Sequence, residues 1–446
     1  MQVWKFGGTS VGKPERMKSI QQLVTSDDEE KIVVLSALSG TTNSLLGIGE
    51  AAKKHEDISA EKQVNELLAH YETFVGELFT TEEGLKKGKA IIENEFNYIR
   101  SLTTIKPFTL KQDKILVAQG ELLSTQIFAA YLVEQEISSV LLPALEFMRI
   151  DADNEPILSE IEYRLKELLS YHTDKKIIVT QGFICRNPRG QVDNLKRGGS
   201  DYTASLIGAA IRAKEIQIWT DIDGMHNNDP RIVSRTFPVR ELSFEEAAEL
   251  AYFGAKVLHP STINPAKMRD IPVRLKNTME PGAPGTVISK SQSSASSSSE
   301  IKAIAAKDNV TAIYIHSTRM LNAYGFLRKV FEIFEKFKTP VDMITTSEVS
   351  VAVTIDNNEN LDKISKMLGQ IADLEEDDRN QSIICIVGNF LADKPNIAIR
   401  VLEAMKDIPI RMISYGASEH NMSLLVDSKD KNAALEALNE GLFTFK

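Results

Sequence analysis

Cysteine is scarce in this sequence of 446 residues, which contains two of them. Cys185 and Cys385 lie far apart along the chain. That spacing fits neither a disulfide framework nor a zinc site with closely spaced thiols. We therefore expect both thiols to be buried and reduced, and we exclude the small disulfide-stabilised folds.

An excess of basic residues is missing as well. Lysine and arginine number 52 against 62 aspartates and glutamates, so the formal net charge is −10. Proteins that bind nucleic acids or membrane surfaces generally need a basic face. The composition therefore predicts no nucleic-acid partner and no membrane partner, although a few local cations can still bind a small anionic substrate.

Targeting signals and membrane spans are not expected either. The first residues contain no basic segment followed by an apolar one, which is the pattern of a signal peptide. No apolar run looks long enough to cross a bilayer. We predict a cytoplasmic protein, and the length predicts two or three domains, each with its own core.

The pattern that is present is an alternation of apolar strands with helical stretches. The expected strands are Ile32–Leu35, Ile177–Thr180, Ile216–Trp219 and Val273–Leu275. This alternation predicts an α/β domain with a mainly parallel sheet, which binds ligands where its strands end. A serine-rich linker follows at residues 289–300, so we predict domains at 1–288 and 301–446.

The segment after the linker contains two similar units. Phe326–Asp356 and Ile397–Asp427 each read as a helix, a proline-containing apolar segment, a Ser-Glu pair and a strand. Two such units in tandem favour paired ligand-sensing modules. The alternative, a duplication that only mediates subunit contacts, is compatible with sensing and stays open.

The segment Lys5-Phe6-Gly7-Gly8-Thr9-Ser10 is the most informative motif. It follows the expected strand Gln2–Phe6 and precedes Pro14, which suits the first turn of a helix. Glycines allow the backbone to approach a phosphate, amide groups donate to its oxygens, and a lysine adds charge. The motif predicts an anion site, although an ordinary strand end with a solvated lysine fits it too.

Further polar clusters follow later strands. Lys196-Arg197-Gly198-Gly199-Ser200-Asp201 places two cations before a glycine turn that opens a helix, so Arg197 can bind a carboxylate in a bidentate manner. Thr220-Asp221 closes a strand ahead of Arg231 and suits a nucleotide pocket, but such residues also form turns.

Two weaker clusters come earlier in the chain. Ser36–Asn43 offers hydroxyl groups for a phosphate or carboxylate, or an ordinary cap. Gln119-Gly120-Glu121 reads as the start of the helix Leu122–Leu132. Glu121 would then either cap that helix or bind a substrate ammonium group.

Taken in order, these motifs resemble the aspartokinases, whose catalytic domain has the amino-acid-kinase fold. The matching segments include Lys5–Ser10, Arg197–Asp201, Thr220–Gly224 and Gly254–Pro260. The resemblance implies a three-layer sandwich with a mainly parallel central sheet, followed by two α+β ACT domains. The ACT units are expected at 311–375 and at 301–310 plus 376–446, because the family inserts one into the other.

The resemblance also implies a reaction. The family transfers the ATP γ-phosphate to the side-chain carboxylate of L-aspartate, giving 4-phospho-L-aspartate, the first step of lysine, threonine and methionine biosynthesis. ATP with Mg²⁺ is the implied nucleotide, and no protein residue is assigned as a metal ligand. The catalytic residues by this resemblance are Lys5, Asp201 and Lys256.

Binding roles carry over residue by residue. The residues implied in ATP binding are Lys5, Gly7, Gly8, Thr9, Thr220, Asp221, His226, Arg231, Lys256 and Val257. Those implied in aspartate binding are Thr42, Glu121, Arg197, Gly198, Gly199 and Ser200. His226 departs from the pattern, because related enzymes often carry tyrosine there.

The C-terminal half resembles the monofunctional, lysine-sensitive class, which implies a homodimer or higher oligomer through the ACT domains. The residues implied in effector binding are Met320, Ala323, Phe326, Leu327, Val341, Asp342, Ser347 and Glu348. Ala323 replaces a serine of a lysine-sensitive relative, so threonine and methionine stay open as effectors beside lysine.

Two rival interpretations stay open at the level of sequence. One is another amino-acid-kinase-fold enzyme acting on acetylglutamate, glutamate or a nucleotide. The other is a non-catalytic amino-acid sensor with a degenerate kinase domain. Turnover of ATP across a panel of acidic amino acids distinguishes them.

Overall fold

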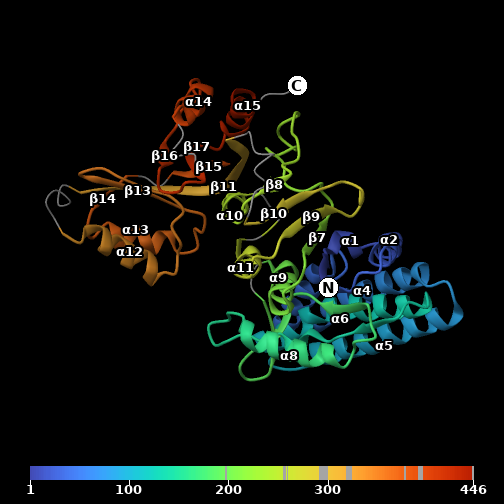
Figure 1. Cartoon of the computed structure of the whole chain (residues 1–446). Helices are drawn as coiled ribbons and strands as arrows, with labels where there is room; N and C mark the ends of the chain where they lie inside the picture. The colour runs from blue at the N-terminus through green and yellow to red at the C-terminus, as the bar shows by residue number, and fades with distance from the viewer. Residues whose placement is uncertain are drawn as a thin grey trace. The chain divides into compact units, whose positions relative to one another are not determined.

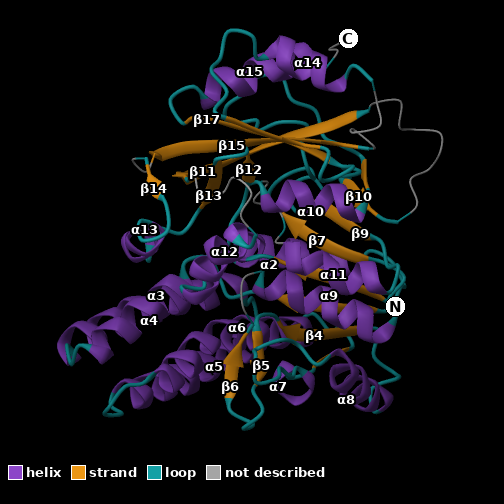
Figure 2. Cartoon of the chain, turned by 90° about the vertical axis from the view of Figure 1, so that its left-hand side faces the viewer, coloured by secondary structure: helices purple, strands orange, loops and turns teal. Residues whose placement is uncertain are grey.

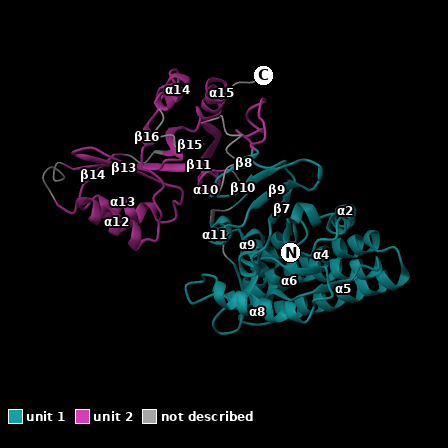
Figure 3. Cartoon of the chain, in the orientation of Figure 1, with its two compact units in different colours: residues 1–225, 240–244, 257–291 teal, residues 226–239, 245–256, 292–446 magenta. Residues whose placement is uncertain are grey.

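The computed structural model describes residues 1–195, 198–254, 258, 260–290, 300–317, 324–375, 378–389 and 395–443. Arg197, Lys256, Val257, Met320 and Ala323, all predicted site residues, lie outside the described residues, as do residues 291–299 of the linker. The chain forms two compact units, coloured separately in Figure 3. Unit 1 comprises residues 1–225, 240–244 and 257–291, and unit 2 comprises residues 226–239, 245–256 and 292–446. The two compact units do not test the predicted domain boundaries at 1–288 and 301–446, which stay a prediction.

Unit 1 contains, among the described residues, an eight-stranded sheet in the order β3-β4-β2-β1-β7-β9-β10-β8. Its neighbours pair in parallel except β9 and β10, which confirms the α/β prediction. The strands are β1 (Gln2–Phe6), β2 (Lys31–Leu35), β3 (Ser139–Leu141), β4 (Ile177–Gln181), β7 (Ile216–Thr220), β8 (Glu241–Leu242), β9 (Val273–Asn277) and β10 (Thr286–Ile288), and a separate hairpin consists of β5 (Ile184–Arg186) and β6 (Val192–Asn194).

Helices occupy both faces of this sheet. Those of the first half are α1 (Gly8–Val11), α2 (Pro14–Val24), α3 (Thr41–Lys53), α4 (Asp57–Leu78), α5 (Glu82–Thr103) and α6 (Leu110–Glu134). Those that follow are α7 (Ala144–Phe147), α8 (Leu158–Ser170), α9 (Gly199–Ile211), α10 (Phe244–Tyr252, mostly in unit 2) and α11 (Pro260–Met268). Pro14 stands at the start of α2, as its fixed φ favours.

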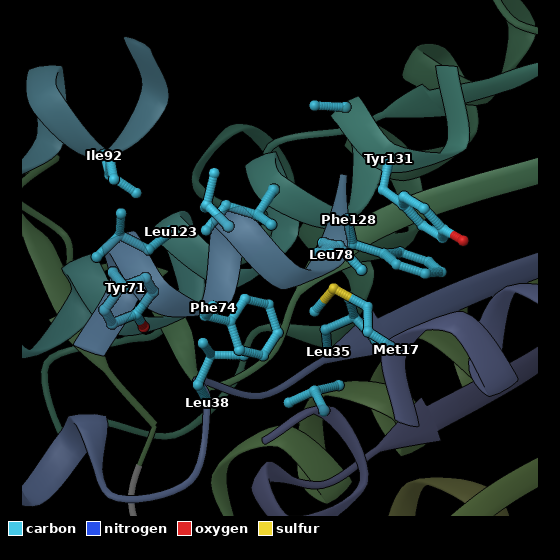
Figure 4. Close-up of a cluster of buried hydrophobic side chains, with 14 of the residues drawn as sticks. Met17, Leu35, Leu38, Tyr71, Phe74, Leu78, Ile92, Leu123, Phe128 and Tyr131 are labelled. Carbon is cyan, nitrogen blue, oxygen red and sulfur yellow. The ribbon is translucent and has the colours of Figure 1, made fainter. Parts of the chain in front are cut away.

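Side-chain alternation along β1 explains the layers. Trp4 and Phe6 point into a hydrophobic cluster with helices α2 to α6, part of which Figure 4 shows. Successive strand side chains point to opposite faces, so Lys5 faces the other layer, where α9 packs on β1, β2 and β7. Helices α8 and α11 pack against α9 in turn, which completes three layers.

Helix α6 corrects two expectations from the sequence. Glu121 lies inside the helix, not at its start, because α6 begins at Leu110. Gly120 does not break the helix, since it serves close packing: a Cβ there would lie 2.8 Å from the Cβ of Ala37. The helix is also long and apolar enough to cross a membrane by composition. Most of it is buried inside unit 1, which identifies it as a core helix.

Unit 2 contains a seven-stranded sheet among its described residues, with helices packed against it (Figures 1 and 2). Its strands are β11 (Ile301–His316), β12 (Ile344–Thr346), β13 (Ser350–Ile355), β14 (Asp373–Leu374), β15 (Asp378–Gly388), β16 (Met412–Tyr415) and β17 (Asn421–Asp427). Its later helices are α12 (Phe326–Lys336), α13 (Leu361–Leu368), α14 (Ile397–Ala404) and α15 (Lys431–Leu442). The helix and strand of each repeated unit are therefore confirmed.

The long strand β11 serves two hydrophobic cores. Its first part, including Ile301 and Ile304, pairs with β15 and packs with α14 and α15. Its last part, including Ile313 and Ile315, pairs with β13 and packs with α12 and α13. A register irregularity separates the two parts between Lys307 and Val310. The insertion of one ACT unit into the other stays a prediction.

Truncation of Phe128 tests the core of unit 1. The side chain is fully buried in α6, so Phe128→Ala should cost about 3–5 kcal/mol. The two tryptophans of the chain, Trp4 and Trp219, both belong to unit 1. Urea unfolding followed by tryptophan fluorescence therefore reports this unit. Val133→Ala, on the exposed side of the same helix, should shift stability by less than about 0.5 kcal/mol. Equal midpoints for both variants would contradict the assigned core.

Candidate active site

An ion pair between Lys5 and Asp201 joins the central strand to α9. The Lys5 Nζ lies 2.7 Å from Asp201 Oδ1, and both side chains are largely buried. Lys5 faces α9 through strand alternation, and Asp201 stands in the first turn of that helix. A helix N-terminus stabilises a carboxylate. The first turn of α9 therefore favours the charged form of Asp201, and Asp201 in turn stabilises the Lys5 ammonium group. Two of the three residues predicted as catalytic are thus in contact, and the third, Lys256, lies outside the described residues.

The glycine turn follows directly after Lys5. Gly7 caps α1, and its carbonyl accepts from the amides of Ser10 and Val11. Ser10 Oγ lies 2.8 Å from Thr278 Oγ1, which holds the turn beside the end of β9. A Cβ on Gly7 would lie 3.1 Å from Lys5 Nζ, and one on Gly8 would lie 3.1 Å from Ala37 O. A side chain at Gly7 or Gly8 would therefore crowd the lysine or the neighbouring loop.

Glu121 lies on the other side of the same loop. Its Oε1 accepts from Ala37 N at 3.3 Å. Its Oε2 is buried and has no hydrogen-bond partner among the described residues. Burial raises the pKa of Glu121 to about 8. A buried carboxylate with an unused oxygen is suited to a cationic ligand, because such a group is costly to leave alone.

A second turn, after β4, was missed at the level of sequence. Gly182 N donates to Leu35 O at the end of β2, and a Cβ on Gly182 would lie 2.4 Å from the Ser200 side chain. Phe183 has a positive φ of 66°, an uncommon conformation for a bulky residue. Its amide donates to Thr203 Oγ1 in α9 at 2.9 Å. The signal was a glycine directly after an apolar strand, the same pattern as at Gly7.

The remaining predicted residues of unit 1 lie near strand or helix ends. Thr42 stands in the first turn of α3, and Gly198, with a φ of 85°, caps α9 ahead of Gly199 and Ser200. Thr220 ends β7, and its hydroxyl donates to Asp221 Oδ1 at 3.2 Å. Parallel strands β1, β2, β4 and β7 are neighbours, so their carboxyl ends share one edge of the sheet.

Two predicted nucleotide residues, His226 and Arg231, belong to unit 2. The His226 ring nitrogen Nδ1 lies 3.1 Å from Thr236 Oγ1. Arg231 forms a bidentate ion pair with Asp229. The Nε donates to Oδ1 at 2.9 Å, and the Nη2 donates to Oδ2 at 2.6 Å. This pair lowers the pKa of Asp229 and raises that of Arg231. Nothing tests their role in nucleotide binding, which stays a prediction.

The described effector residues gather around the core of unit 2 that contains α12 and α13. Phe326 and Val341 pack in that core, Leu327 is exposed in α12, and Ser347 Oγ accepts from Ser350 N. Glu348 follows in the exposed turn before β13.

Asp342 is the buried acid of this group. Its side chain is inaccessible to solvent, and its Oδ1 accepts from Tyr252 Oη at 2.6 Å and from Lys307 Nζ at 2.8 Å. Its Oδ2 is buried and has no hydrogen-bond partner in the described part of the chain. Burial and the bond to Asp342 raise the pKa of Tyr252.

A cavity of about 1000 Å³ opens elsewhere in unit 1. It lies between α4 and the end of α5, and its lining includes Ile58, Ala69 and Thr103. No predicted site residue lines it. The candidate site therefore rests on the contacts above and not on this cavity.

The sequence matches two family models. The amino acid kinase family matches residues 1–277, and an ACT domain matches residues 384–442. Aspartokinase 3, chloroplastic, of Arabidopsis thaliana is 39% identical over 99% of this chain and 81% of its own length. Lysine-sensitive aspartokinase 3 of Escherichia coli (strain K12) is 33% identical over 99% of both chains.

Solved structures of an aspartokinase are similar to this chain as well. The structure of E. coli aspartokinase III in complex with aspartate and ADP (R-state) has a TM-score of 0.86 and 32% identity, covering 100% of both chains. The structure of that enzyme in complex with lysine and aspartate (T-state) has a TM-score of 0.81, also covering 100% of both chains.

Glu121 should make stability depend on pH. Its pKa rises from 4.5 to about 8 on folding, so the folded chain holds the extra proton between those values. Stability should therefore fall as the pH rises through this window, by up to about 1.4 kcal/mol per pH unit. Glu121→Gln removes the titrating group.

The measurement is urea unfolding by tryptophan fluorescence at several pH values from 5 to 9. The stability of Glu121→Gln relative to the native chain should increase with pH, because other groups titrate alike in both. A difference that stays constant across the range would contradict a raised pKa for Glu121.

Proposed function

The chain belongs to the aspartokinase family, and we propose that it transfers the γ-phosphate of ATP to the side-chain carboxylate of L-aspartate. The product is 4-phospho-L-aspartate, and the reaction is the first step of lysine, threonine and methionine biosynthesis. One observation carries the catalytic part of this proposal: the buried Lys5–Asp201 pair stands directly before a glycine turn. The E. coli relative solved in complex with aspartate and ADP supports both substrates.

Charge neutralisation is the main task of this site. The side-chain carboxylate of aspartate is ionised at neutral pH, so its attack on phosphorus needs no general base. The site must align the two substrates and neutralise the phosphoryl oxygens. Lys5 and the amides of the turn at Gly7 and Gly8 supply positive charge, and Lys256 is proposed as a second cation.

Asp201 has two compatible tasks. It holds the Lys5 ammonium in place, and it is a carboxylate of the kind that binds a magnesium ion together with nucleotide phosphates. The ion would contribute further neutralisation of phosphate charge. ATP with Mg²⁺ is therefore the nucleotide that fits these residues.

Aspartate would be bound at both of its charged ends. The unused oxygen of Glu121 is suited to the substrate ammonium group, which would lower the raised pKa of this carboxyl. Arg197 is proposed to bind the α-carboxylate, with Thr42, Gly198, Gly199 and Ser200 beside it. A panel of aspartate, glutamate and acetylglutamate, read by hydroxylamine trapping of the acyl phosphate, tests the assignment. Turnover of another acid in preference to aspartate would overturn it.

Feedback inhibition by an amino acid, with lysine as the proposed effector, would act at the ACT domains. Asp342 supports this, since it is buried and keeps one oxygen without a partner in the described part of the chain. The E. coli relative solved in complex with lysine and aspartate supports lysine as the effector.

Self-association through the ACT domains is proposed as well. Exposed apolar side chains repeat at helical spacing on α12, at Leu327 and Phe331, and on α14, at Ile399 and Leu402. Apolar groups arranged in this way are common at protein interfaces. Light scattering should give at least a dimer, and a monomer at micromolar concentration would overturn the proposal.

Lys5→Ala should abolish phosphoryl transfer while the fold stays intact. Removal of a charge that acts in the transition state should lower kcat by at least about 10²-fold. The control is Lys18→Ala on α2, whose Nζ donates to Glu77 O in an exposed contact. A folded Lys5→Ala protein with turnover near that of the native chain would refute the catalytic role.

Asp342→Asn should weaken lysine inhibition. The lysine concentration for half-inhibition should rise at least about tenfold. The substitution removes the negative charge of Asp342 that is proposed to pair with an ammonium group of the bound lysine. Asp362→Asn is the control, since Asp362 is exposed on α13. Full activity of the native chain at saturating lysine would refute lysine as effector, and threonine and methionine are then tested in the same assay.

A further inference from the structure

The side chain of Ser10, the last residue of the motif Lys5–Ser10, is buried in unit 1. Its Oγ lies 2.8 Å from Thr278 Oγ1 and 3.5 Å from the carbonyl oxygen of Trp219. These partners follow Ser10 by 268 and 209 residues along the chain. The hydroxyl group of Ser10 thus attaches the glycine turn to two segments that are distant in sequence.

Thr278 connects the glycine turn to the end of β7. It directly follows β9, which ends at Asn277, and its side chain is buried. The amide of Thr278 donates to Thr220 O at 2.8 Å, while its hydroxyl group contacts Ser10. One residue therefore bonds two segments that are both proposed to bind ATP, the glycine turn and the end of β7.

The direct connection between β1 and β7 is weak at this edge of the sheet. The parallel ladder between the two strands ends at the pair Phe6 and Trp219. Just beyond it, the amide of Gly7 donates to Trp219 O at 3.5 Å, which is long for a hydrogen bond. The contact between Ser10 and Thr278 is shorter, and it is buried, where a hydroxyl group without a partner is costly. This contact is therefore the tighter link between the turn and the end of β7.

We propose that Ser10 and Thr278 are a pair of positioning residues that hold the glycine turn at the distance from Thr220 at which one ATP molecule contacts both. Phosphoryl transfer depends on alignment, and a displacement of about 1 Å can lower its rate by about 10²-fold. Neither hydroxyl group is proposed as a ligand of the nucleotide, because both are buried against each other. The inference rests on the proposed function, since it takes the glycine turn and Thr220 as parts of the nucleotide site.

A second pair of hydroxyl groups offers a matched control. In unit 2, Ser382 Oγ lies 2.9 Å from Ser428 Oγ, and Ser382 is fully buried in β15. This contact resembles the one between Ser10 and Thr278 in chemistry, length and burial. Neither Ser382 nor Ser428 belongs to the proposed active site or effector site. Ser382→Ala therefore shows what the loss of such a contact costs elsewhere in the chain.

The experiment compares Ser10→Ala, Thr278→Val and the double variant with Ser382→Ala. Thr278→Val keeps the shape of the side chain and the amide bond to Thr220. Calorimetry gives the affinity for ADP, hydroxylamine trapping gives kcat and both KM values, and circular dichroism confirms that each variant is folded.

Each single variant should weaken ADP binding and raise KM for ATP at least about fivefold, because the link of the turn to Thr278 is lost. KM for aspartate should stay within about twofold. The double variant should match the single ones, since either substitution alone breaks the contact. Thr278→Ser, which keeps the hydroxyl group, should retain most of the ADP affinity, and Ser382→Ala should change neither KM.

The outcomes separate the two claims. If the native chain phosphorylates aspartate but Ser10→Ala and Thr278→Val match Ser382→Ala, the positioning role is overturned and the proposed function stands. Equal rises in KM for ATP and aspartate would overturn that role too, since they indicate general loosening of unit 1.

A native chain that binds ADP without aspartate-dependent turnover would overturn the proposed function, and the ADP affinities of the variants would still decide the positioning role. A native chain that does not bind ADP would overturn both. If Ser10→Ala does not fold, the comparison of Thr278→Val with Thr278→Ser decides the question alone.

Discussion

The contact between Lys5 and Asp201 is the interaction on which the candidate site depends. It brings a buried cation from the central strand against the N-terminus of α9, where the helix favours a carboxylate. Both side chains are largely buried, so removal of either one would leave the other charge poorly compensated. The pair thereby fixes the glycine turn of β1 against the first turn of α9. Among the described residues of unit 1, several groups proposed to bind nucleotide or aspartate lie near this edge of the sheet.

The other contacts of unit 1 extend from this pair through close backbone approaches. Gly8 and Gly120 allow the loop at Ala37 to lie between β1 and α6, and Gly182 allows Ser200 to approach the end of β4. A Cβ at Gly120 or Gly182 would lie closer than 3.0 Å to a neighbouring side chain, and one at Gly8 would crowd the Ala37 carbonyl at 3.1 Å. Unit 2 also contains a buried carboxylate with polar partners. Lys307 and Tyr252 both donate to Asp342. In each unit a buried acid is proposed to bind a charged ligand: Glu121 the ammonium group of aspartate, and Asp342 the effector lysine.

Much of this arrangement could be predicted from the sequence, for reasons that are local. Apolar runs gave β2, β4, β7 and β9 to within about one or two residues, because a buried parallel strand needs a continuous apolar segment. Lys5 and Asp201 could be predicted because each lies close to a pair of glycines in the sequence. The family match over residues 1–277 agrees with the motifs on which that prediction rested.

The failures have a common physical cause, which is tertiary packing that local pattern does not reveal. Gly120 suggested a helix start, yet α6 continues through it because the glycine serves contact with Ala37. The apolar length of α6 reflects burial inside unit 1, which a composition rule cannot distinguish from a membrane span. Phe183 and the Ser10–Thr278 pair went unnoticed, since partners far apart in sequence define them.

The central claim is that a side-chain oxygen of aspartate attacks the γ-phosphorus of ATP at this site. It is tested most directly with aspartate carrying ¹⁸O in its side-chain carboxylate, unlabelled ATP, and hydroxylamine to cleave the acyl phosphate at carbon. The bridging oxygen then leaves with phosphate, which ³¹P NMR detects by its isotope shift. The account predicts phosphate with one ¹⁸O atom, equal in amount to the ADP formed. Unlabelled phosphate would mean that water attacks the nucleotide, and it would contradict the account.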